Sequence, residues 1–317
     1  MIQLSPESLN YIHKFTSKMD VKDSKYYKQL FQYFNSHYSS DVPTHTLTEH
    51  PVSITLPDNR FISTNIRKSI HRLQKYHVIK SNRITMHIYH NDDITNFIRI
   101  TLTYINFMYN LSGSTKRLTI TYYLTDNKKV QINRILTPDE VNTGSTDSSG
   151  VTIWRKEEVF KTTIHELIHF FKLDYRDDKK ITEYYRHKYK CISETINSFE
   201  AYVDFWAILI NSFLSTKLLK NPYMFFVNCL NLEQTFVEYQ SHKIIKLDRD
   251  YNRYTNVLPY YIIKAELFRN LPKTLKVLEC HMGLTDKYFE YLRGLQKVVP
   301  KKRFTDPTLR MSIVEIV

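Results

Sequence analysis

The spacing of apolar residues predicts helices at the start of the chain. A Ser-Pro-Glu helix start at residues 5–7 precedes apolar positions at helical spacing, and residues 26–34 keep the same period. The stretch 39–59 holds three prolines, so we expect a linker or long loop there. A further helix is predicted over residues 63–76.

The middle of the chain changes between strand-like and helix-like patterns. Alternating or β-branched runs predict strands, and longer amphipathic runs predict helices. The predicted order is strand 83–90, helix 95–111, strands 118–124 and 130–135, polar loop 142–150, strand 151–154 and helix 156–172. Nearly every segment after residue 192 has a helical pattern. We therefore predict an α+β fold, in which a small mixed sheet packs on the 156–172 helix and a mostly helical subdomain follows.

The length and apolar content are enough for one large domain with a short N-terminal addition. The chain has 317 residues, of which 42% are hydrophobic, so a sizeable core is available. We predict a helical extension and linker over residues 1–60 and a catalytic domain over 61–317. Within that domain we expect a sheet subdomain at about 80–172 and a helical subdomain at about 173–317.

Composition argues against several classes of protein. Only five glycines are present, and both glycine-rich loops that hold nucleotide phosphates are missing. Cys191, Cys229 and Cys280 are far apart, so neither a disulfide framework nor a thiolate zinc site is expected. The chain shows no signal-peptide pattern and no apolar stretch long enough to cross a membrane. We therefore expect a cytoplasmic protein that is not secreted and has no membrane partner.

The charge balance raises the question of nucleic acid. With 45 Lys and Arg against 32 Asp and Glu, the net charge is +13, which attracts polyanions. The sequence contains no nucleic-acid-binding motif to support that role. A basic nucleic-acid-binding protein is therefore an alternative that we do not favour.

One short motif carries recognisable chemistry. The sequence HELIH at residues 165–169 lies in the predicted 156–172 helix. Residues four apart on a helix point to the same side, so His165 and His169 can bind one Zn²⁺ together. Glu166 projects beside them, where its carboxylate can take a proton from a water that the metal activates.

A zinc site that catalyses a reaction needs a third protein ligand. In the apolar segment 192–214, Asn197, Glu200, Asp204 and Asn211 fall within about 60° of one another at 100° per residue. Buried carboxylates are costly unless they are paired or bind a metal. We expect Glu200 to bind zinc and Asp204 to accept a hydrogen bond from a ligand histidine. Asn197, Glu200, Asp204 and Asn211 thus form a polar stripe on this segment. Glu194, on the edge of the stripe, is the rival ligand.

These residues resemble the motifs of the gluzincin metallopeptidases, which are thermolysin-like. The pattern consists of the HELIH motif and the later sequence EAYVD at residues 200–204. The resemblance implies a zincin-like fold in which His165, His169 and Glu200 bind zinc. It further implies that Glu166 is the general base and that Asp204 supports a histidine.

Two departures from the gluzincin pattern stand beside this resemblance. Phe199 occupies the position where the family usually has Asn, and the separation between His169 and Glu200 is longer than in thermolysin. Over about residues 80–270 the chain also resembles uncharacterised HExxH proteins of large cytoplasmic DNA viruses. That second resemblance implies a viral protein, located in the host cytoplasm or the virion, and implies no substrate.

Residues outside the motif offer weaker candidates. A Tyr or His often stabilises the oxyanion in gluzincins. The candidates here are Tyr260, Tyr261 and His242, with His281 weaker still.

Basic residues near the predicted 151–154 strand suggest a place for substrate. If the strand that ends at Trp154 is the sheet edge above the zinc, an extended peptide could pair with it. Arg155 and Lys156 could then bind acidic groups, although a solvated basic pair is the simpler interpretation. The run at residues 301–303 is interpreted as a solvated surface patch.

The sequence therefore predicts a zinc metallopeptidase that acts on a protein or peptide substrate. Zinc is expected on His165, His169 and Glu200, with Glu166 as general base. The main alternative is a catalytically inactive structural or virion-packaged zinc protein. A fourth protein ligand on the metal would favour that alternative, because catalysis needs an open position.

Overall fold

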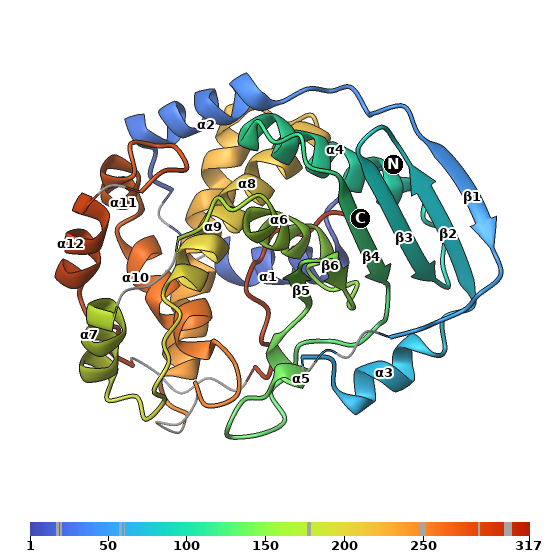
Figure 1. Cartoon of the computed structure of the whole chain (residues 1–317). Helices are drawn as coiled ribbons and strands as arrows, with labels where there is room; N and C mark the ends of the chain where they lie inside the picture. The colour runs from blue at the N-terminus through green and yellow to red at the C-terminus, as the bar shows by residue number, and fades with distance from the viewer. Residues whose placement is uncertain are drawn as a thin grey trace.

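A six-stranded mixed sheet forms one side of the molecule in the computed structural model, and most helices lie on the other (Figure 1). The model describes residues 1–16, 19, 21–56, 59, 61–175, 179–247, 252–284, 286–300 and 306–317. The strands are β1 (Thr46–His50), β2 (Lys75–Lys80), β3 (Ile84–His90), β4 (Leu118–Tyr123), β5 (Gly144–Asp147) and β6 (Gly150–Ile153). Their order in the sheet is β1-β2-β3-β4-β6-β5. The pairs β3–β4 and β4–β6 are parallel, and the other pairs are antiparallel.

The predicted strands near 83–90, 118–124 and 151–154 are confirmed, but the sheet has three further strands that the pattern does not predict. The expected linker 39–59 contains β1, and β2 begins at Lys75, inside the end of the expected 63–76 helix. The sheet therefore extends into the segment that we expect to be an N-terminal extension. The predicted polar loop contains β5, and this strand, rather than β6, is the edge of the sheet. The expected 130–135 strand is wrong, since only an isolated bridge from Val130 to Thr308 forms there.

Helices account for most of the remaining chain. They are α1 (Pro6–Thr16), α2 (Lys25–His37), α3 (Thr64–Ile70), α4 (Thr95–Ser112), α5 (Pro138–Val141), α6 (Val159–Phe170), α7 (Lys179–Tyr189), α8 (Phe199–Leu218), α9 (Tyr223–Ile244), the π-helix η1 (Leu258–Ile263), α10 (Lys264–Arg269), α11 (Leu271–Val277) and α12 (Asp286–Gly294). The predicted helices at the N-terminus, at 95–111 and around the HELIH motif are confirmed, and the fold is mixed α+β as expected.

Different elements pack on the two faces of the sheet. Alternate strand residues such as Met86 and Ile120 join the main core together with Ile98 of α4 and Ile164 of α6. On the opposite face, α3 packs over buried residues that include Tyr89. Helix α6 therefore lies between the sheet and the remaining helices, where it contacts β5, β6, α4 and α8. This position brings the HELIH motif to the junction of the two halves.

Helix α8 crosses the middle of the helical half. Every residue from Phe199 to Thr216 is buried. The helix begins at Phe199 rather than near residue 192, so the preceding segment is a loop. That start places Glu200 in the first turn, close to the end of the helix that faces α6.

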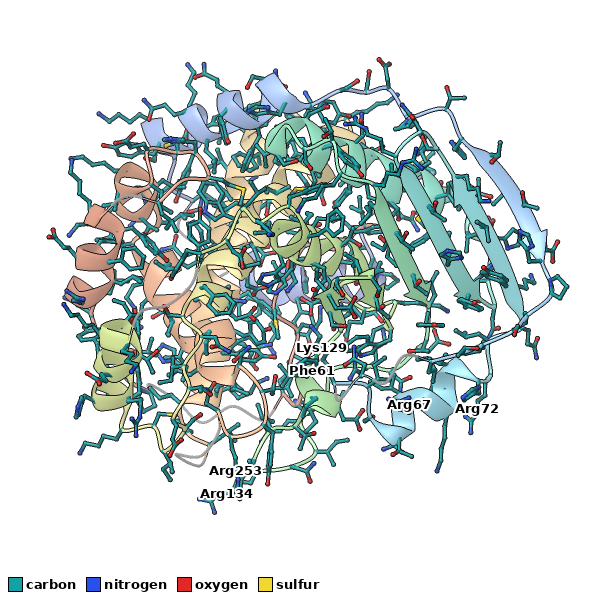
Figure 2. All side chains as sticks on the ribbon, viewed as in Figure 1. Phe61, Arg67, Arg72, Lys129, Arg134 and Arg253 are labelled. Atoms are coloured by element: carbon teal, nitrogen blue, oxygen red, sulfur yellow. The ribbon has the colours of Figure 1, made fainter. Side chains whose placement is uncertain are left out.

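The segment 306–317 runs through the interior and carries polar groups with it. Backbone N–H groups of Met311 and Ser312 donate to the Glu158 carboxylate, at 2.8 and 2.6 Å, just before α6 begins. Glu158 also pairs with buried Lys129 at 2.8 Å. Figure 2 shows the Lys129 side chain within the body of the molecule, whereas Arg72 beside α3 points outward. A buried network of charges thus joins the C-terminal segment to the start of α6.

Candidate metal centre

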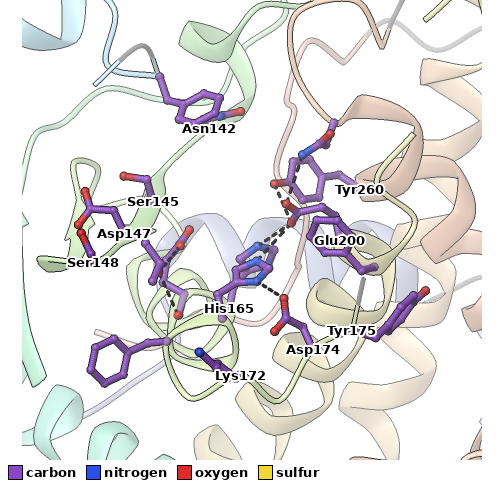
Figure 3. A pocket seen from close by; sticks show the side chains of 18 of the residues that line it. Asn142, Ser145, Asp147, Ser148, His165, Lys172, Asp174, Tyr175, Glu200 and Tyr260 are labelled. Carbon is purple, nitrogen blue, oxygen red and sulfur yellow. Dashed lines mark hydrogen bonds and ion pairs between the residues drawn. The ribbon is translucent and has the colours of Figure 1, made fainter. Parts of the chain in front are cut away.

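The two histidines of the motif meet Glu200 at the contact between α6 and α8. His165 and His169 lie one turn apart on α6, and Glu200 lies in the first turn of α8. Their ligand-type atoms are all within 4.8 Å of one another, so the three side chains could hold a metal ion. Glu200 Oε2 is 3.2 Å from His165 Nε2 and 3.4 Å from His169 Nε2 (Figure 3). The arrangement brings together the three side chains that the sequence points to as ligands.

Each histidine has a carboxylate behind it. Asp204 Oδ1 lies 3.3 Å from His165 Nδ1, as expected for a supporting group, although the contact is not aligned as a hydrogen bond. Asp174 Oδ2 forms a 2.8 Å hydrogen bond with His169 Nδ1. A carboxylate at Nδ1 favours a proton there and leaves the Nε2 lone pair for a metal. The donor set therefore fits a metal ion that prefers nitrogen and oxygen ligands, such as zinc.

The carboxylate of Asp204 has partners that the sequence interpretation does not include. From the sequence we expect only a hydrogen bond from a ligand histidine to this buried carboxylate. In the structure Lys161 Nζ lies 2.5 Å from Asp204 Oδ1, and Lys264 Nζ contacts Asp204 Oδ2. Asp174 is also absent from the sequence interpretation, because it lies five residues after His169 in a segment without helical pattern. By contrast, Lys161 precedes His165 by four residues, which is a recognisable helical spacing.

Burial and charge act in opposite directions on the ligand side chains. Burial alone would raise the pKa of the Glu200 carboxyl, but contacts with His165 and His169 hold it well below its usual range. Burial alone would lower the pKa of His169, but hydrogen bonds with Asp174 and Glu200 raise it to about 10. The pKa of His165 is raised as well, because Asp204 and Glu200 outweigh burial. Near neutral pH and without metal, the Glu200 carboxylate therefore lies beside a protonated His169.

Glu166 is held against the edge strand β5. The Thr146 hydroxyl donates to Glu166 Oε2 at 2.8 Å and also contacts the Glu166 carbonyl oxygen at 3.0 Å. A Cβ atom on Gly144 would lie 3.0 Å from both Cγ and Oε1 of Glu166. Glycine at this position is what lets the carboxylate approach the strand. Glu166 thus lines the same cavity as the metal-binding group.

Of the four candidate oxyanion stabilisers, only Tyr260 reaches the site. Its hydroxyl donates to Glu200 Oε2 at 3.1 Å, and its ring lies 5.8 Å from that of His165. The π-helix η1 sets this position. Tyr261 points elsewhere and donates to the Leu309 carbonyl. His242 contacts Glu238, and exposed His281 contacts the Glu279 carbonyl; neither lines the cavity around the motif.

The rival ligand and the remaining stripe residues have other positions. Glu194 is exposed in the loop before α8, and the metal-binding group contains Glu200 instead. Asn211 is part of the core, where it accepts from the Tyr104 hydroxyl and donates to the Val314 carbonyl. Asn197 donates to Asn256, whose amide in turn donates to Glu200 Oε1 at 3.2 Å. The stripe therefore divides into a part at the metal centre and a part that joins helices.

Neither interpretation of the basic pair after Trp154 describes Arg155, which is buried and is not available as a solvated or substrate-binding group. Trp154 is buried in the small core under α3. The Arg155 guanidinium is 1% exposed and binds backbone carbonyls, including that of Asn142 at 3.0 Å. Lys156 pairs with two aspartates, one of them at 2.8 Å. Residues 301–303, the other basic run, lie outside the described residues.

A large cavity opens over the motif. It has a volume of about 1040 Å³ and is lined by β5, by both histidines and Glu166 of α6, and by Glu200 and Tyr260. A second cavity of about 690 Å³ shares Phe61, Glu200 and Asn256 with it. The two cavities therefore adjoin at these three residues. The metal-binding group therefore lines a cavity of the structure.

Comparisons with known proteins give one partial match. The chain is 27% identical over 195 residues to an uncharacterised protein of Acanthamoeba polyphaga mimivirus, with 52% of this chain covered. The match spans about half of the length of that relative. The match is compatible with a viral origin and gives no information about activity. No family model and no solved structure matches the chain. Among the described residues, no helix is long and apolar enough to cross a membrane.

Proposed function

We propose that this protein is a zinc-dependent peptidase with a zincin-like fold. The observation that carries the proposal is the convergence of His165, His169 and Glu200 beside Glu166 in one large cavity. Among the described residues, the group contains three ligand-type side chains and no fourth. An open position favours catalysis over a purely structural metal.

The residues around the site support hydrolysis of a peptide bond. Zinc on these three side chains would supply a Lewis acid that polarises a carbonyl and acidifies a water molecule. Glu166 would take the proton of the attacking water and pass it to the leaving amine. Thr146 fixes one oxygen of that carboxylate. Tyr260, next to Glu200, is the best placed donor for the developing oxyanion.

The edge strand supports an extended polypeptide as substrate. Among the described strands, β5 has a neighbour in the sheet only on its β6 side, and all four of its residues line the cavity. A peptide can therefore add to this edge through backbone hydrogen bonds. The two cavities that meet at Glu200 leave room for chain on both sides of the cleaved bond. This geometry favours cleavage inside a polypeptide over removal of a terminal residue.

The test is the variant Glu166→Gln, with Glu183→Gln on α7 as a matched control. Glu183 is exposed and lies on a helix away from the cavity. We expect wild-type protein to bind one zinc ion and to cleave an unstructured protein such as casein. The Glu166 variant should keep the zinc and lose at least about a hundredfold in rate, whereas the control should lose neither.

Two other results would reject the proposal. Activity retained by Glu166→Gln would exclude the assigned general base. Wild-type protein that binds zinc but cleaves no protein in a broad substrate mixture would favour the structural alternative.

A further inference from the structure

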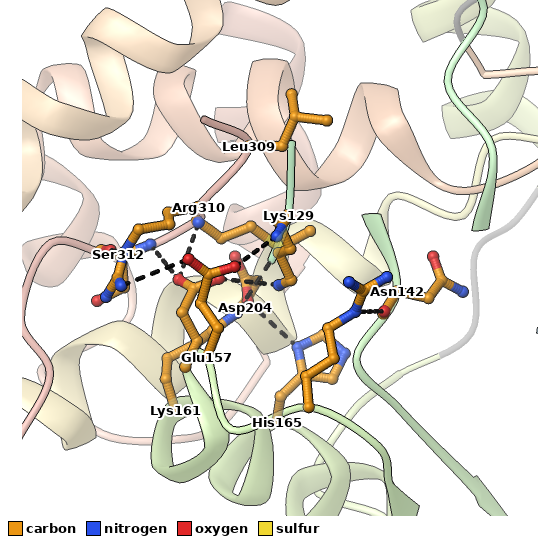
Figure 4. Close-up of polar contacts among 12 residues, drawn as sticks. Lys129, Asn142, Glu157, Lys161, His165, Asp204, Leu309, Arg310 and Ser312 are labelled. Atoms are coloured by element: carbon orange, nitrogen blue, oxygen red, sulfur yellow. Dashed lines mark hydrogen bonds and ion pairs between the residues drawn. The ribbon is translucent and has the colours of Figure 1, made fainter. Parts of the chain in front are cut away.

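The charges behind the metal-binding group are paired with one another. Four cations there lie within ion-pair distance of four carboxylates, and Figure 4 shows part of this group around Asp204 and Arg310. The pairs are Lys129 with Glu158, Lys161 and Lys264 with Asp204, and Arg310 with Glu157 and Glu315. Charges in the interior need such partners. This group therefore has no charge left for a ligand.

Three cations at one end of the large cavity differ from that group. Lys116, Arg117 and Lys172 line the cavity and are exposed. They form no ion pair with any residue that the structure describes. The Lys116 ammonium instead contacts the Phe170 carbonyl at the end of α6, at 3.5 Å. A helix C-terminus carries only a partial negative charge, so it offsets little of theirs.

One carboxylate lies near these cations. Asp147 ends β5, and its Oδ1 accepts hydrogen bonds from the backbone N–H and the hydroxyl of Ser149 in the turn to β6. The other carboxylates that line the cavity belong to the metal centre and have partners there, namely Glu166, Asp174 and Glu200. Three cations and one carboxylate thus leave an excess of positive charge at this end of the cavity.

The fold places the three cations where β5 ends. Strand β5 is antiparallel to β6, and β6 is parallel to β4, so β5 ends at the side of the sheet where β4 begins. Lys116 and Arg117 directly precede β4. The contact between Lys116 and the end of α6 brings Lys172 to the same place. Figure 3 shows Lys172 on the side of His165 away from Tyr260.

A peptide that pairs with β5 passes these cations close to the cleaved bond. Lys172 follows His169 by three residues, which is about 4.5 Å along a helix axis. An extended peptide advances about 3.3 Å per residue, so a side chain one or two residues from the bond lies within reach of the cations. The second cavity lacks such a cluster, because apart from Glu200 and Arg253 its lining residues are uncharged.

We propose that Lys116, Arg117 and Lys172 form a subsite for acidic side chains, so that the enzyme prefers peptides with Asp or Glu on one side of the cleaved bond. The inference rests on the proposed function and names its class of substrate. One exposed ion pair changes affinity only a few-fold, so a useful preference needs several cations together. The adjacent strand edge favours a peptide over a nucleic acid, because a peptide backbone can pair with it.

The experiment compares two pools of unstructured peptides that are identical except that every Glu of one pool is Gln in the other. Binding is measured in zinc-loaded Glu166→Gln protein, at low and high salt, so that neither pool is consumed. The test variants in this background are Lys172→Glu and Arg117→Glu. The control is Lys220→Glu. Lys220 is exposed, lies outside both cavities and has the same left-handed conformation after α8, with φ of 55° against 57° for Lys172.

We expect the acidic pool to bind about fivefold more tightly than the Gln pool at low salt, and the ratio to fall at high salt. Both test variants should lose this preference, and the control should keep it. When the protein with Glu166 intact cleaves the acidic pool, mass spectrometry should find acidic residues enriched within two positions of the cleaved bonds, on one side only.

Equal binding of the two pools would overturn the inference, as would a preference that both test variants keep or that the control also loses. The subsite would also be rejected if a single-stranded oligonucleotide bound more tightly than the acidic pool and both test variants abolished that binding. Cleavage without acidic preference would reject the subsite and leave the peptidase standing. A preference in binding that depends on Lys172 and Arg117, without cleavage of either pool, would support the subsite and reject the peptidase.

Discussion

Protons compete with metal at this site, so its affinity for zinc should depend steeply on pH. Burial lowers the pKa of His169, but hydrogen bonds with Asp174 and Glu200 outweigh burial and raise it to about 10. The pKa of His165 is raised in the same manner. A histidine must lose its Nε2 proton before it can bind zinc. Metal binding near neutral pH must therefore release at least the proton of His169.

The size of the effect follows from the number of protons. Each displaced proton costs about tenfold in affinity for every pH unit below its pKa. With His169 alone protonated the slope is about tenfold per unit, and with both histidines protonated it approaches about a hundredfold. Affinity should rise with pH and level off above about pH 10, where the His169 proton is already lost. Chelator competition between pH 6.5 and 9.5 measures the slope, and calorimetry in buffers of different ionisation enthalpy counts the protons.

The variant Asp174→Asn tests the cause of this slope. The hydrogen bond that His169 donates to Asp174 is the largest contribution that raises the pKa of His169, so its loss should move the plateau to lower pH. Asp147→Asn, in the exposed part of the same cavity, is the matched control and should keep the wild-type slope. A wild-type affinity that is flat between pH 7 and 9 would refute the reasoning, because His169 would then be neutral without metal.

Three further predictions concern single residues. Gly144→Ala would place its Cβ 3.0 Å from Glu166, so we expect at least about tenfold lower turnover with unchanged zinc content; full activity would show that Glu166 can move. Tyr260→Phe removes the hydroxyl that donates to Glu200, and we expect kcat to fall by about tenfold or more while KM changes little; an equal kcat would exclude it as the oxyanion donor. Burial raises the pKa of Glu233 to about 7, so its contribution to stability is full below pH 4.5 and is lost as the pH rises through about 7. Denaturation should show Glu233→Gln gaining about 3 kcal/mol relative to wild type between pH 5 and 8, and a difference that is constant with pH would contradict this.

The periodicity of the sequence predicts long elements well and short polar strands poorly. The helix around the HELIH motif has apolar residues on most sides, so its pattern alone identifies it. Strand β1 has five exposed residues, and β5 consists of Gly, Ser, Thr and Asp. Such strands form because a neighbouring strand offers backbone hydrogen-bond partners. The local sequence pattern contains no information about that neighbouring strand. For this reason the sequence pattern places the edge of the sheet at β6 instead of β5.

The metal-binding residues are predictable because their spacing is a property of helices. His165 with His169, and Glu200 with Asp204, are each four apart, and a buried carboxylate needs a partner. Asp174 and Asn256 reach the site from segments without such a period, so only the folded chain brings them to it.

The two lysines behind the metal centre are an intermediate case between these extremes. Lys161 precedes His165 by one turn in a helix that is buried along most of its length, and Lys264 follows Tyr260 in an apolar segment. A lysine that cannot reach water must have a buried partner. The helical stripe on its own links Asp204 only to a histidine, and it leaves both cations without a counter-charge. If the buried charges of all the apolar segments are considered together, rather than along one helix, Lys161 and Lys264 become candidate partners of Asp204.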